Sequence, residues 1–287
     1  MKIKKLIEKT MNTIFLVCGM VSIGCVLFIT AYMIYSGLPA IFEIGASDFF
    51  LGQVWKSTAS TPLFGILPFI LTSVWGTLGA IVIGVPVGLL TAIYLSKLAS
   101  KKTVVVIRPA VQLLAGIPSV VYGLIGMMVL VPAVQKAFSL PSGATLFSAI
   151  LVLAVMILPS IITVSETALL AVPEEYEQAS LALGANEIET VFRVSVPAAK
   201  SGIVAGVVLG VGRAIGEAMA VMMVAGNVAN MPGIFTSVRF LTTAVASEMS
   251  YASGLQERAL FSIALVLYCF IMIINALLNH FLKKEHN

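Results

Sequence analysis

The sequence predicts an all-α polytopic membrane protein with six transmembrane helices, and three observations lead to this fold class. The 287 residues are 59% hydrophobic and only 10% charged, whereas water-soluble domains carry roughly 25% charged residues. The apolar residues show no period-two alternation, so helices, which satisfy their own backbone hydrogen bonds in lipid, are favoured over a barrel. Finally, six long runs lack Asp, Glu, Lys and Arg: 10–42, 57–96, 109–135, 137–165, 218–238 and 259–282.

A helix needs about 20 apolar residues to cross the hydrocarbon layer. The run 57–96 is long enough for two spans, but Pro62, Gly65 and Pro68 interrupt its first third, which is therefore interpreted as an outer loop and the start of a helix. Pro86 is expected to bend the second helix without ending it. The expected spans are 12–35, 67–95, 111–132, 146–170, 203–226 and 259–282.

The basic residues predict the orientation of these spans. With six spans, both termini lie on the same side as the loops near 96–108 and 171–202. That side carries twelve Lys and Arg and the other side four, which with Arg213 inside a span accounts for all 17. Loops rich in Lys and Arg remain in the cytoplasm. We therefore expect a multi-pass protein of the plasma or inner membrane with both termini in the cytoplasm.

One membrane domain follows from this organisation. Residues 1–66 are expected to form an N-terminal anchor helix and an outer loop, because 13–35 is longer than the roughly 7–15 residues of a signal-peptide core. Residues 67–282 are expected to form the transmembrane domain, with a cytoplasmic loop at 171–202. Residues 283–287 are expected to be a cytoplasmic tail.

Motifs for enzymatic chemistry are missing from the sequence. There is no phosphate-binding G-x-x-x-x-G-K-[ST], no H-E-x-x-H and no G-x-S-x-G. Its two histidines, His280 and His286, lie near the C-terminus, and Cys18, Cys25 and Cys269 all fall within spans, so neither a metal site nor a disulfide framework is expected. The chain is therefore expected to be a transporter subunit or a scaffold that holds no cofactor of its own.

The loop 171–202 predicts two short helices that meet at Gly184. Pro173 and three Glu favour the start of the first helix, and Gly184 would end it in a left-handed conformation. Asn186 with Glu189 three residues later is typical of a capping box. The loop holds five Glu but only two basic residues, so a protein partner is favoured over anionic lipid.

In this loop the sequence resembles ABC importer permeases, which carry the motif E-A-A-x3-G-x9-I-x-L-P. Here residues 178–180 read Gln-Ala-Ser, and Gly184 and Pro197 follow at the family spacing. Gln178 stands where the family usually has Glu, and Glu177 precedes it. The resemblance implies the type I ABC importer permease fold, with this loop as a coupling helix that docks on a separate, ATP-binding ATPase subunit. The implied coupling residues are Glu177, Gln178, Ala179, Gly184 and Pro197.

Other segments are similar to the permeases of phosphate (Pst) ABC importers, which combine an A-type and a C-type subunit. The similar segments are 64–68, 114–123 and 213–217, and those that look C-type are 218–227, 231–232, 238–239 and 259–261. The resemblance implies a C-type permease that forms a phosphate pathway with a second, A-type permease. It also implies an ATPase dimer and an extracytoplasmic phosphate-binding protein as partners.

Two charged residues, Arg213 and Glu217, fall near the middle of the fifth expected span. In a continuous helix they would share a stripe about 80° wide with Gly202, Gly206 and Gly210. An ionisable group at that depth costs roughly 2.5–3.5 kcal/mol unless it faces a partner or water. The pair could be a structural contact on a packing face. Alternatively it lines the substrate route, with Arg213 binding the anion through its planar fork and Glu217 holding Arg213 between turnovers; the resemblance favours this second interpretation.

Two further sites have weaker signals. Pro118 and the nearby glycines would permit a broken helix at the start of the third span, although a simple kink is expected. Glu166 is expected to be an interfacial acid, with a gate contact as the alternative.

Gly84–Gly88 and Gly206–Gly210 are small-xxx-small pairs that predict close helix packing.

The alternatives differ in substrate or in class. The nearest are the A-type permease or a permease for another oxyanion, such as sulfate or molybdate. An ion-coupled secondary transporter is disfavoured because inverted repeats, common in that class, are not found in the sequence. In a non-transporting membrane scaffold, Arg213 and Glu217 would be purely structural.

Overall fold

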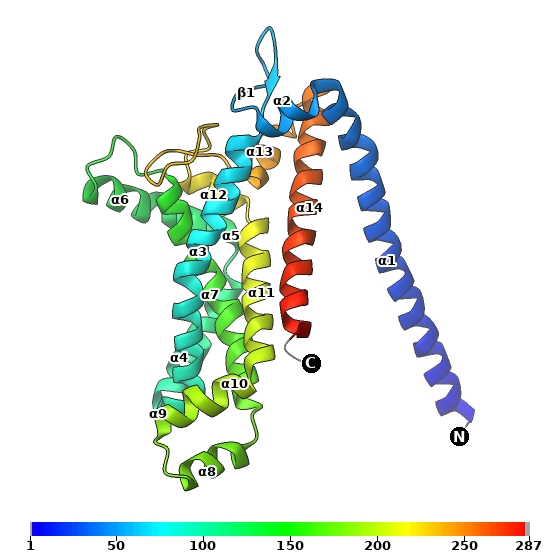
Figure 1. Cartoon of the computed structure of the whole chain (residues 1–287). Helices are drawn as coiled ribbons and strands as arrows, with labels where there is room; N and C mark the ends of the chain where they lie inside the picture. The colour runs from blue at the N-terminus through cyan, green and yellow to red at the C-terminus, as the bar shows by residue number, and fades with distance from the viewer. Residues whose placement is uncertain (1, 285–287) are drawn as a thin grey trace.

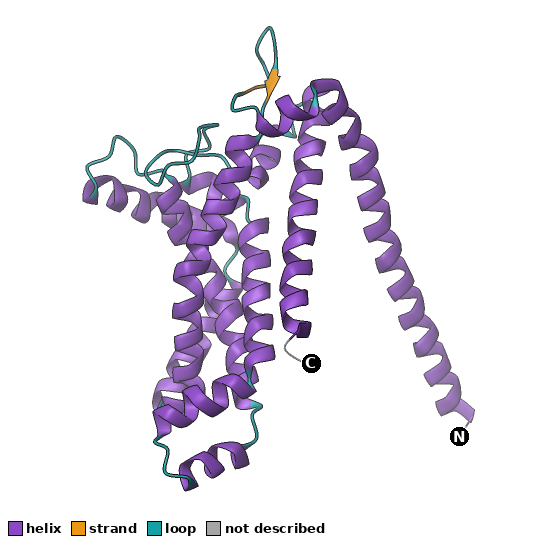
Figure 2. Cartoon of the chain, in the orientation of Figure 1, coloured by secondary structure: helices purple, strands orange, loops and turns teal. Residues whose placement is uncertain are grey.

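The structure, a computed structural model, describes residues 2–284, so the last three residues of the expected tail at 283–287 lie outside the described residues. Helices dominate the chain, and the one sheet in this part of it is a short antiparallel hairpin in which Trp55 pairs with Phe64 (Figures 1 and 2). The all-α membrane fold predicted from composition is therefore confirmed.

The elements follow one another with short connections. The first half of the chain holds α1 (Lys2–Ile44), α2 (Ala46–Leu51), β1 (Trp55–Lys56), β2 (Leu63–Phe64), α3 (Leu67–Ile93), the π-helical turn η1 (Tyr94–Leu98), α4 (Lys101–Gly116), α5 (Ser119–Ile125), the π-helical turn η2 (Gly126–Leu130) and α6 (Val131–Ala137). The second half holds α7 (Leu146–Leu170), α8 (Glu174–Ala182), α9 (Glu187–Thr190), the π-helical turn η3 (Val191–Ser195), α10 (Val196–Ala198), α11 (Lys200–Gly216), α12 (Met219–Val224), α13 (Leu241–Glu248) and α14 (Leu255–Lys284).

Within the described residues, five helical segments are long and apolar enough to cross a membrane: Glu8–Ile44, Leu67–Leu98, Ser119–Ala137, Leu146–Leu170 and Leu255–Ala276. A sixth span arises if Glu187–Ala198 and Lys200–Gly216, which are bent by 72° relative to each other, count as one. Pro86 lies inside α3 without ending it, as predicted. The third and fifth spans depart from their expected bounds of 111–132 and 203–226, because both helices are broken.

Helix α7 is the centre of the bundle, with α3 on one flank and α11 on another. Both glycine pairs make this close packing possible. A Cβ added at Gly84 would lie 2.6 Å from Ile157 Cδ1, and one at Gly210 would lie 2.9 Å from Ile161 Cγ1. Because Ile157 and Ile161 are both fully buried, the glycines predicted to pack do so against α7.

The two ends of the bundle differ in construction (Figure 1). One end, called here the hairpin end, carries β1, β2, α2 and α13. The opposite end, called here the α8 end, carries α8, α9 and α10; α1 runs from this side up to the hairpin end, and α14 runs back toward the α8 end. Helix α1 leans away from the bundle and contacts α14, where Ser262 Oγ donates to the Gly37 carbonyl at 2.6 Å. Most of the α1 surface is therefore exposed.

Candidate functional site

The fifth span is broken at Glu217. Helix α11 ends at Gly216, Glu217 is extended with φ −74° and ψ 127°, and α12 begins at Met219. The expectation of one continuous helix over 203–226 is therefore wrong. Because Glu217 lies outside the helix, the expected stripe shared by Arg213, Glu217 and the glycines does not form.

Two contacts stabilise this break, one of them local and the other tertiary. The Glu217 side chain is buried, and its Oε1 accepts a hydrogen bond from the Ala220 N–H at 2.9 Å. This contact caps the first turn of α12, where backbone N–H groups have no helical partner. The Glu217 carbonyl accepts from Thr242 Oγ1 at 2.7 Å. Both the side chain and the carbonyl of Glu217 are therefore occupied by hydrogen bonds that hold the broken segment in place.

Arg213 lies in the last turn of α11 and is half-buried. Within residues 2–284 its guanidinium has no hydrogen bond and no ion pair, with Glu217 or with any other residue. The glycine stripe on the same helix packs against α7, with a Cβ at Gly206 only 3.2 Å from Ser165 Oγ. The packing interpretation therefore accounts for the glycines and leaves Arg213 without a partner in the described part of the chain.

The third span is also broken, at Ile117 and Pro118, so the expected simple kink is wrong. Helix α4 ends at Gly116, both following residues are extended, and α5 begins at Ser119. Proline lacks an N–H, which leaves the Leu114 carbonyl without its helical donor, and it disfavours helical geometry in the residue before it. The Tyr122 hydroxyl donates to that Leu114 carbonyl at 2.7 Å. Tyr122, one turn after the proline, thus compensates for the break.

The two breaks adjoin each other in space, because α5 packs directly against α12. A Cβ added at Gly123 would lie 2.8 Å from the Cα of Ala220. In contrast, a Cβ at Gly116, Gly212 or Gly216 would meet nothing within 4 Å. The helical turns just before both breaks therefore border open space. In membrane proteins, irregular backbone at this depth is found where it is buried in protein or lines a water-filled cavity.

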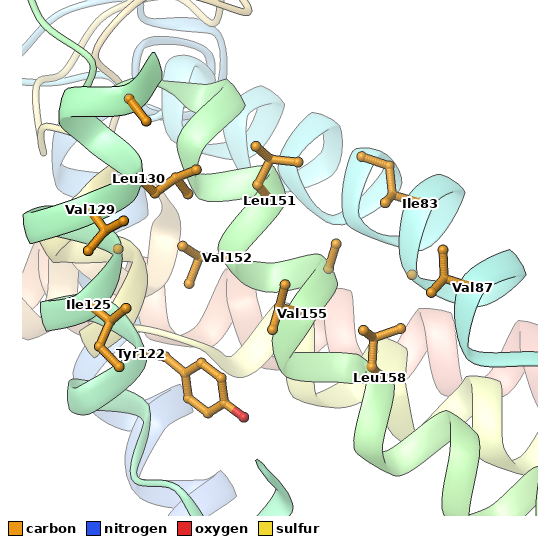
Figure 3. A pocket seen from close by; sticks show the side chains of 14 residues that line it. Ile83, Val87, Tyr122, Ile125, Val129, Leu130, Leu151, Val152, Val155 and Leu158 are labelled. Atoms are coloured by element: carbon orange, nitrogen blue, oxygen red, sulfur yellow. The ribbon is translucent and has the colours of Figure 1, made fainter. Parts of the chain in front are cut away.

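An apolar cavity of about 550 Å³ lies between α3, α7 and the segment α5–η2–α6 (Figure 3). Ile83, Val87, Ile125, Val155 and Leu158 are among the side chains that line it. Its lining is almost entirely hydrocarbon, which suits lipid or another helix but not an inorganic anion. The cavity is therefore not the candidate substrate site.

The local geometry of the segment 171–202 agrees with the sequence. Gly184 has φ +91°, the left-handed conformation that ends α8. Asn186 Oδ1 accepts from the Glu189 N–H at 2.9 Å, and Glu189 Oε2 accepts from the Asn186 N–H at 3.1 Å, which completes the predicted capping box. Pro197 lies in α10 and is exposed.

The other predicted coupling residues lie on different faces of α8. Gln178 and Ala179 are exposed, and Gln178 Nε2 donates to Glu174 Oε1 at 3.1 Å. Glu177 points inward and pairs with Lys97 Nζ at 2.5 Å. The outer surface of the segment also exposes large apolar side chains: Tyr176, Leu181, Leu183, Ile188 and Phe192.

Several polar contacts were not foreseen. Glu166 is buried within the protein, and its Oε1 pairs with Arg108 Nη2 at 2.6 Å, which joins α7 to α4. At the hairpin end, the Glu248 carboxylate pairs with Arg239 and accepts from Trp55 Nε1 at 3.1 Å. The partners are 58 residues apart for Arg108 and Glu166 and 9 residues apart for Arg239 and Glu248, so no short motif predicts either contact. For Arg108 and Glu166, the sequence signal that could have indicated a contact is a charged residue that interrupts an apolar run.

Comparison with known proteins identifies the family. The family described as "Binding-protein-dependent transport system inner membrane component" matches residues 84–285. The probable ABC transporter permease protein YqgH of Bacillus subtilis (strain 168) is 36% identical over 269 residues, 91% of this chain and 87% of that protein. The phosphate transport system permease protein PstC of Pasteurella multocida (strain Pm70) is 34% identical over 223 residues, 71% of this chain and 69% of that protein.

Solved structures show the same fold. A structure of the MetNI methionine ABC transporter in an inward-facing conformation has a TM-score of 0.57 at 21% sequence identity, covering 77% of this chain and 94% of that one. An amino acid ABC transporter has a TM-score of 0.53 at 18% identity, with coverage of 76% and 92%. The chain belongs to the family of binding-protein-dependent transport system inner membrane components and is the permease component of an ABC importer.

Proposed function

We propose that this chain is the C-type permease of an ATP-driven phosphate importer. Several similar proteins carry the name PstC, at 31–34% identity over 66–83% of this chain. A second, A-type permease would complete the pathway, and an extracytoplasmic phosphate-binding protein would deliver the substrate at the hairpin end. The α8 end, with both termini, would face the cytoplasm.

Arg213 would bind the phosphate on its way through the membrane. The observation that carries this proposal is a guanidinium in the last turn of α11 without a partner in the described chain, one turn before a break that borders open space. A charge within a membrane-spanning segment is tolerated when it faces water or a counter-ion, and the planar fork of Arg matches the oxygens of phosphate. Glu217 would act by positioning α12 beside this site instead of holding Arg213.

The segment 171–202 would couple the pathway to a separate ATPase dimer, which would bind and hydrolyse the ATP. Its support is the exposed apolar and acidic surface of α8 and α9 at the α8 end. An amphipathic helix whose apolar side chains are exposed at the end of a bundle is suited to docking in a groove of a partner. ATP binding would draw two such segments together and reorient the helices around the shared route.

Uptake assays test the role of Arg213. In cells that lack the native chain, Arg213→Ala should reduce uptake of radiolabelled phosphate about tenfold or more, since a hydrogen bond to a charged group contributes about 1.5–3 kcal/mol and 1.4 kcal/mol corresponds to tenfold. Arg213→Lys should retain part of the uptake. Lys136→Ala, an exposed cation outside the breaks, is the matched control. Unchanged phosphate uptake by Arg213→Ala at normal membrane abundance would exclude the proposed route.

The same assay separates the other substrates and classes. Preferential uptake of sulfate or molybdate would identify a permease for another oxyanion, and uptake that persists without an ATPase would indicate a secondary transporter.

For the coupling role, Gly184→Pro should abolish copurification of the ATPase, because proline cannot adopt the positive φ of this turn.

A further inference from the structure

Glu177, which directly precedes the expected coupling motif and was included among the coupling residues, is part of a polar cluster inside the chain. Its Oε1 pairs with Lys97 Nζ at 2.5 Å and accepts from Ser195 Oγ at 2.8 Å. The Lys97 side chain is 12% exposed, the Glu177 side chain is 22% exposed, and Ser195 is fully buried. The Glu177 carboxylate is therefore largely turned away from a partner at the α8 end.

The cluster joins three elements that are far apart in sequence. Glu177 belongs to α8, Lys97 to η1 at the end of the long helix α3, and Ser195 to the last turn of η3, which leads through α10 into α11. One turn along the same face of α8, the Ser180 and Thr190 hydroxyls lie 3.0 Å apart and link α8 to α9. The polar side of α8 is thus bonded to the inner ends of the helices that flank α7.

Besides the chain itself, which enters α8 just after the buried Val172, these polar contacts attach α8 to the bundle. None of the residues of α8 is buried, so the helix has no apolar anchor of its own in the described chain. Its remaining charged and polar side chains, Glu174, Glu175 and Gln178, are exposed. A force applied to the outer face of α8 would therefore reach the bundle through Glu177 and Ser180.

We propose that the Lys97–Glu177–Ser195 cluster is the link through which movement of α8 is transmitted to α3 and α11, and that Glu177 is a positioning residue and not a contact to the ATPase. This inference rests on the proposed function, in which α8 docks on an ATPase. The partly buried ion pair suits the task, because removal of one partner leaves the other charge desolvated and uncompensated. The exposed face of α8 remains free to meet the ATPase.

The test uses the complete transporter, purified with its partner subunits and reconstituted in vesicles, with phosphate uptake and ATP hydrolysis measured in parallel. Glu177→Gln and Lys97→Met should each lower the phosphate transported per ATP hydrolysed about fivefold or more, the lower end of ordinary coupling between two sites. Copurification of the ATPase should be unchanged. The matched control is Glu8→Gln, which removes the same charge from the exposed surface of α1, outside the segment proposed to dock, and should leave the ratio unchanged.

The charge exchange Lys97→Glu with Glu177→Lys should restore part of the ratio, a rescue that a general loss of stability would not produce. The inference is overturned if Glu177→Gln releases the ATPase while Lys97→Met does not, because Glu177 would then contact the ATPase directly. An unchanged ratio in both single variants also overturns it. If the unaltered chain copurifies with no ATPase, the proposed function itself fails, and that outcome is distinct from the other two.

Discussion

The two helix breaks reach nearly the same backbone geometry by different means. Each follows a glycine that borders open space, and the residue at each break is extended: Ile117 has φ −70° and ψ 127°, and Glu217 has φ −74° and ψ 127°. The break in the third span has a local cause, Pro118. No proline lies at the break in the fifth span, where the Glu217 side chain and Thr242 bind the backbone instead.

A broken helix in lipid requires substitutes for the backbone hydrogen bonds that it loses. In the third span a tyrosine supplies the substitute donor, to the Leu114 carbonyl. In the fifth span a carboxylate supplies the substitute acceptor, to the Ala220 N–H. We therefore expect the fifth-span break to depend on side chains more strongly than the third-span break does.

The largest effect is expected at Glu217. Glu217→Ala removes the cap and leaves a buried N–H unpaired, which costs up to about 3 kcal/mol of folding free energy. Glu217→Gln keeps an oxygen acceptor of the same reach and should stay close to the parent stability. Thermal unfolding of the purified complex measures both. Equal melting of Glu217→Ala and Glu217→Gln would show that the side chain does not maintain the break.

The contact between the two segments after the breaks is tested at Gly123. A Cβ there would lie 2.8 Å from the Cα of Ala220, which is backbone and cannot rotate away, so Gly123→Ala should destabilise the complex by about 1–3 kcal/mol. Gly116→Ala is the matched control, because a Cβ there meets nothing within 4 Å. If the two variants melt alike, α5 and α12 do not pack as closely as described.

A smaller effect is expected at Thr242. Thr242→Val has nearly the same shape but cannot donate to the Glu217 carbonyl, and the loss of one such hydrogen bond costs about 0.5–1.5 kcal/mol. Thr243→Val offers a comparison on the next residue, whose hydroxyl bonds locally to Phe240. Uptake should fall more in Thr242→Val than in Thr243→Val, since only the former contacts the break. If uptake falls more in Thr243→Val than in Thr242→Val, the hydrogen bond from Thr242 does not maintain the break.

The smallest effects are expected at the third-span break. Tyr122→Phe removes the donor to the Leu114 carbonyl, which still accepts from the Ile117 N–H at 3.3 Å, so the cost should be at most about 1 kcal/mol. Pro118→Ala supplies a new backbone N–H for that carbonyl. Thermal melting of the double variant should therefore show a smaller loss than Tyr122→Phe alone. If the loss in the double variant equals the sum of the changes in the two single variants, this compensation is contradicted.

Local signals in the sequence predicted much of the fold correctly. The charge-free runs identified the first, second, fourth and sixth spans, since a charged residue within lipid is costly whatever the tertiary arrangement. Gly184 and the Asn186–Glu189 capping box were also correct, because each depends on neighbours within a few residues. The positions of Gly84 and Gly210 predicted close packing, although not that α7 was the partner of both.

The break at Glu217 could not be predicted in this way. Residues 203–226 carry the composition of a continuous apolar helix, and the contact that favours the break comes from Thr242, 25 residues later. Similarly, Glu177 was singled out because it precedes the coupling motif, but the direction of its side chain depends on Lys97, which lies at the end of the second span. The resemblance did not indicate which side of α8 Glu177 occupies.

From the residues alone it follows that this chain is a membrane protein, which segments are apolar enough to cross the bilayer, and which charged residues lie among them. These properties follow from the transfer of each side chain out of water, which depends on composition and on short-range spacing. Which of those charged groups are hydrogen-bonded or paired, and which have no partner within the described chain, depends on the tertiary structure. Hydrogen-bond partners in this fold come from distant segments, and it is their positions that occupy Glu217, Glu166 and Glu177 while leaving Arg213 without a partner in the described chain.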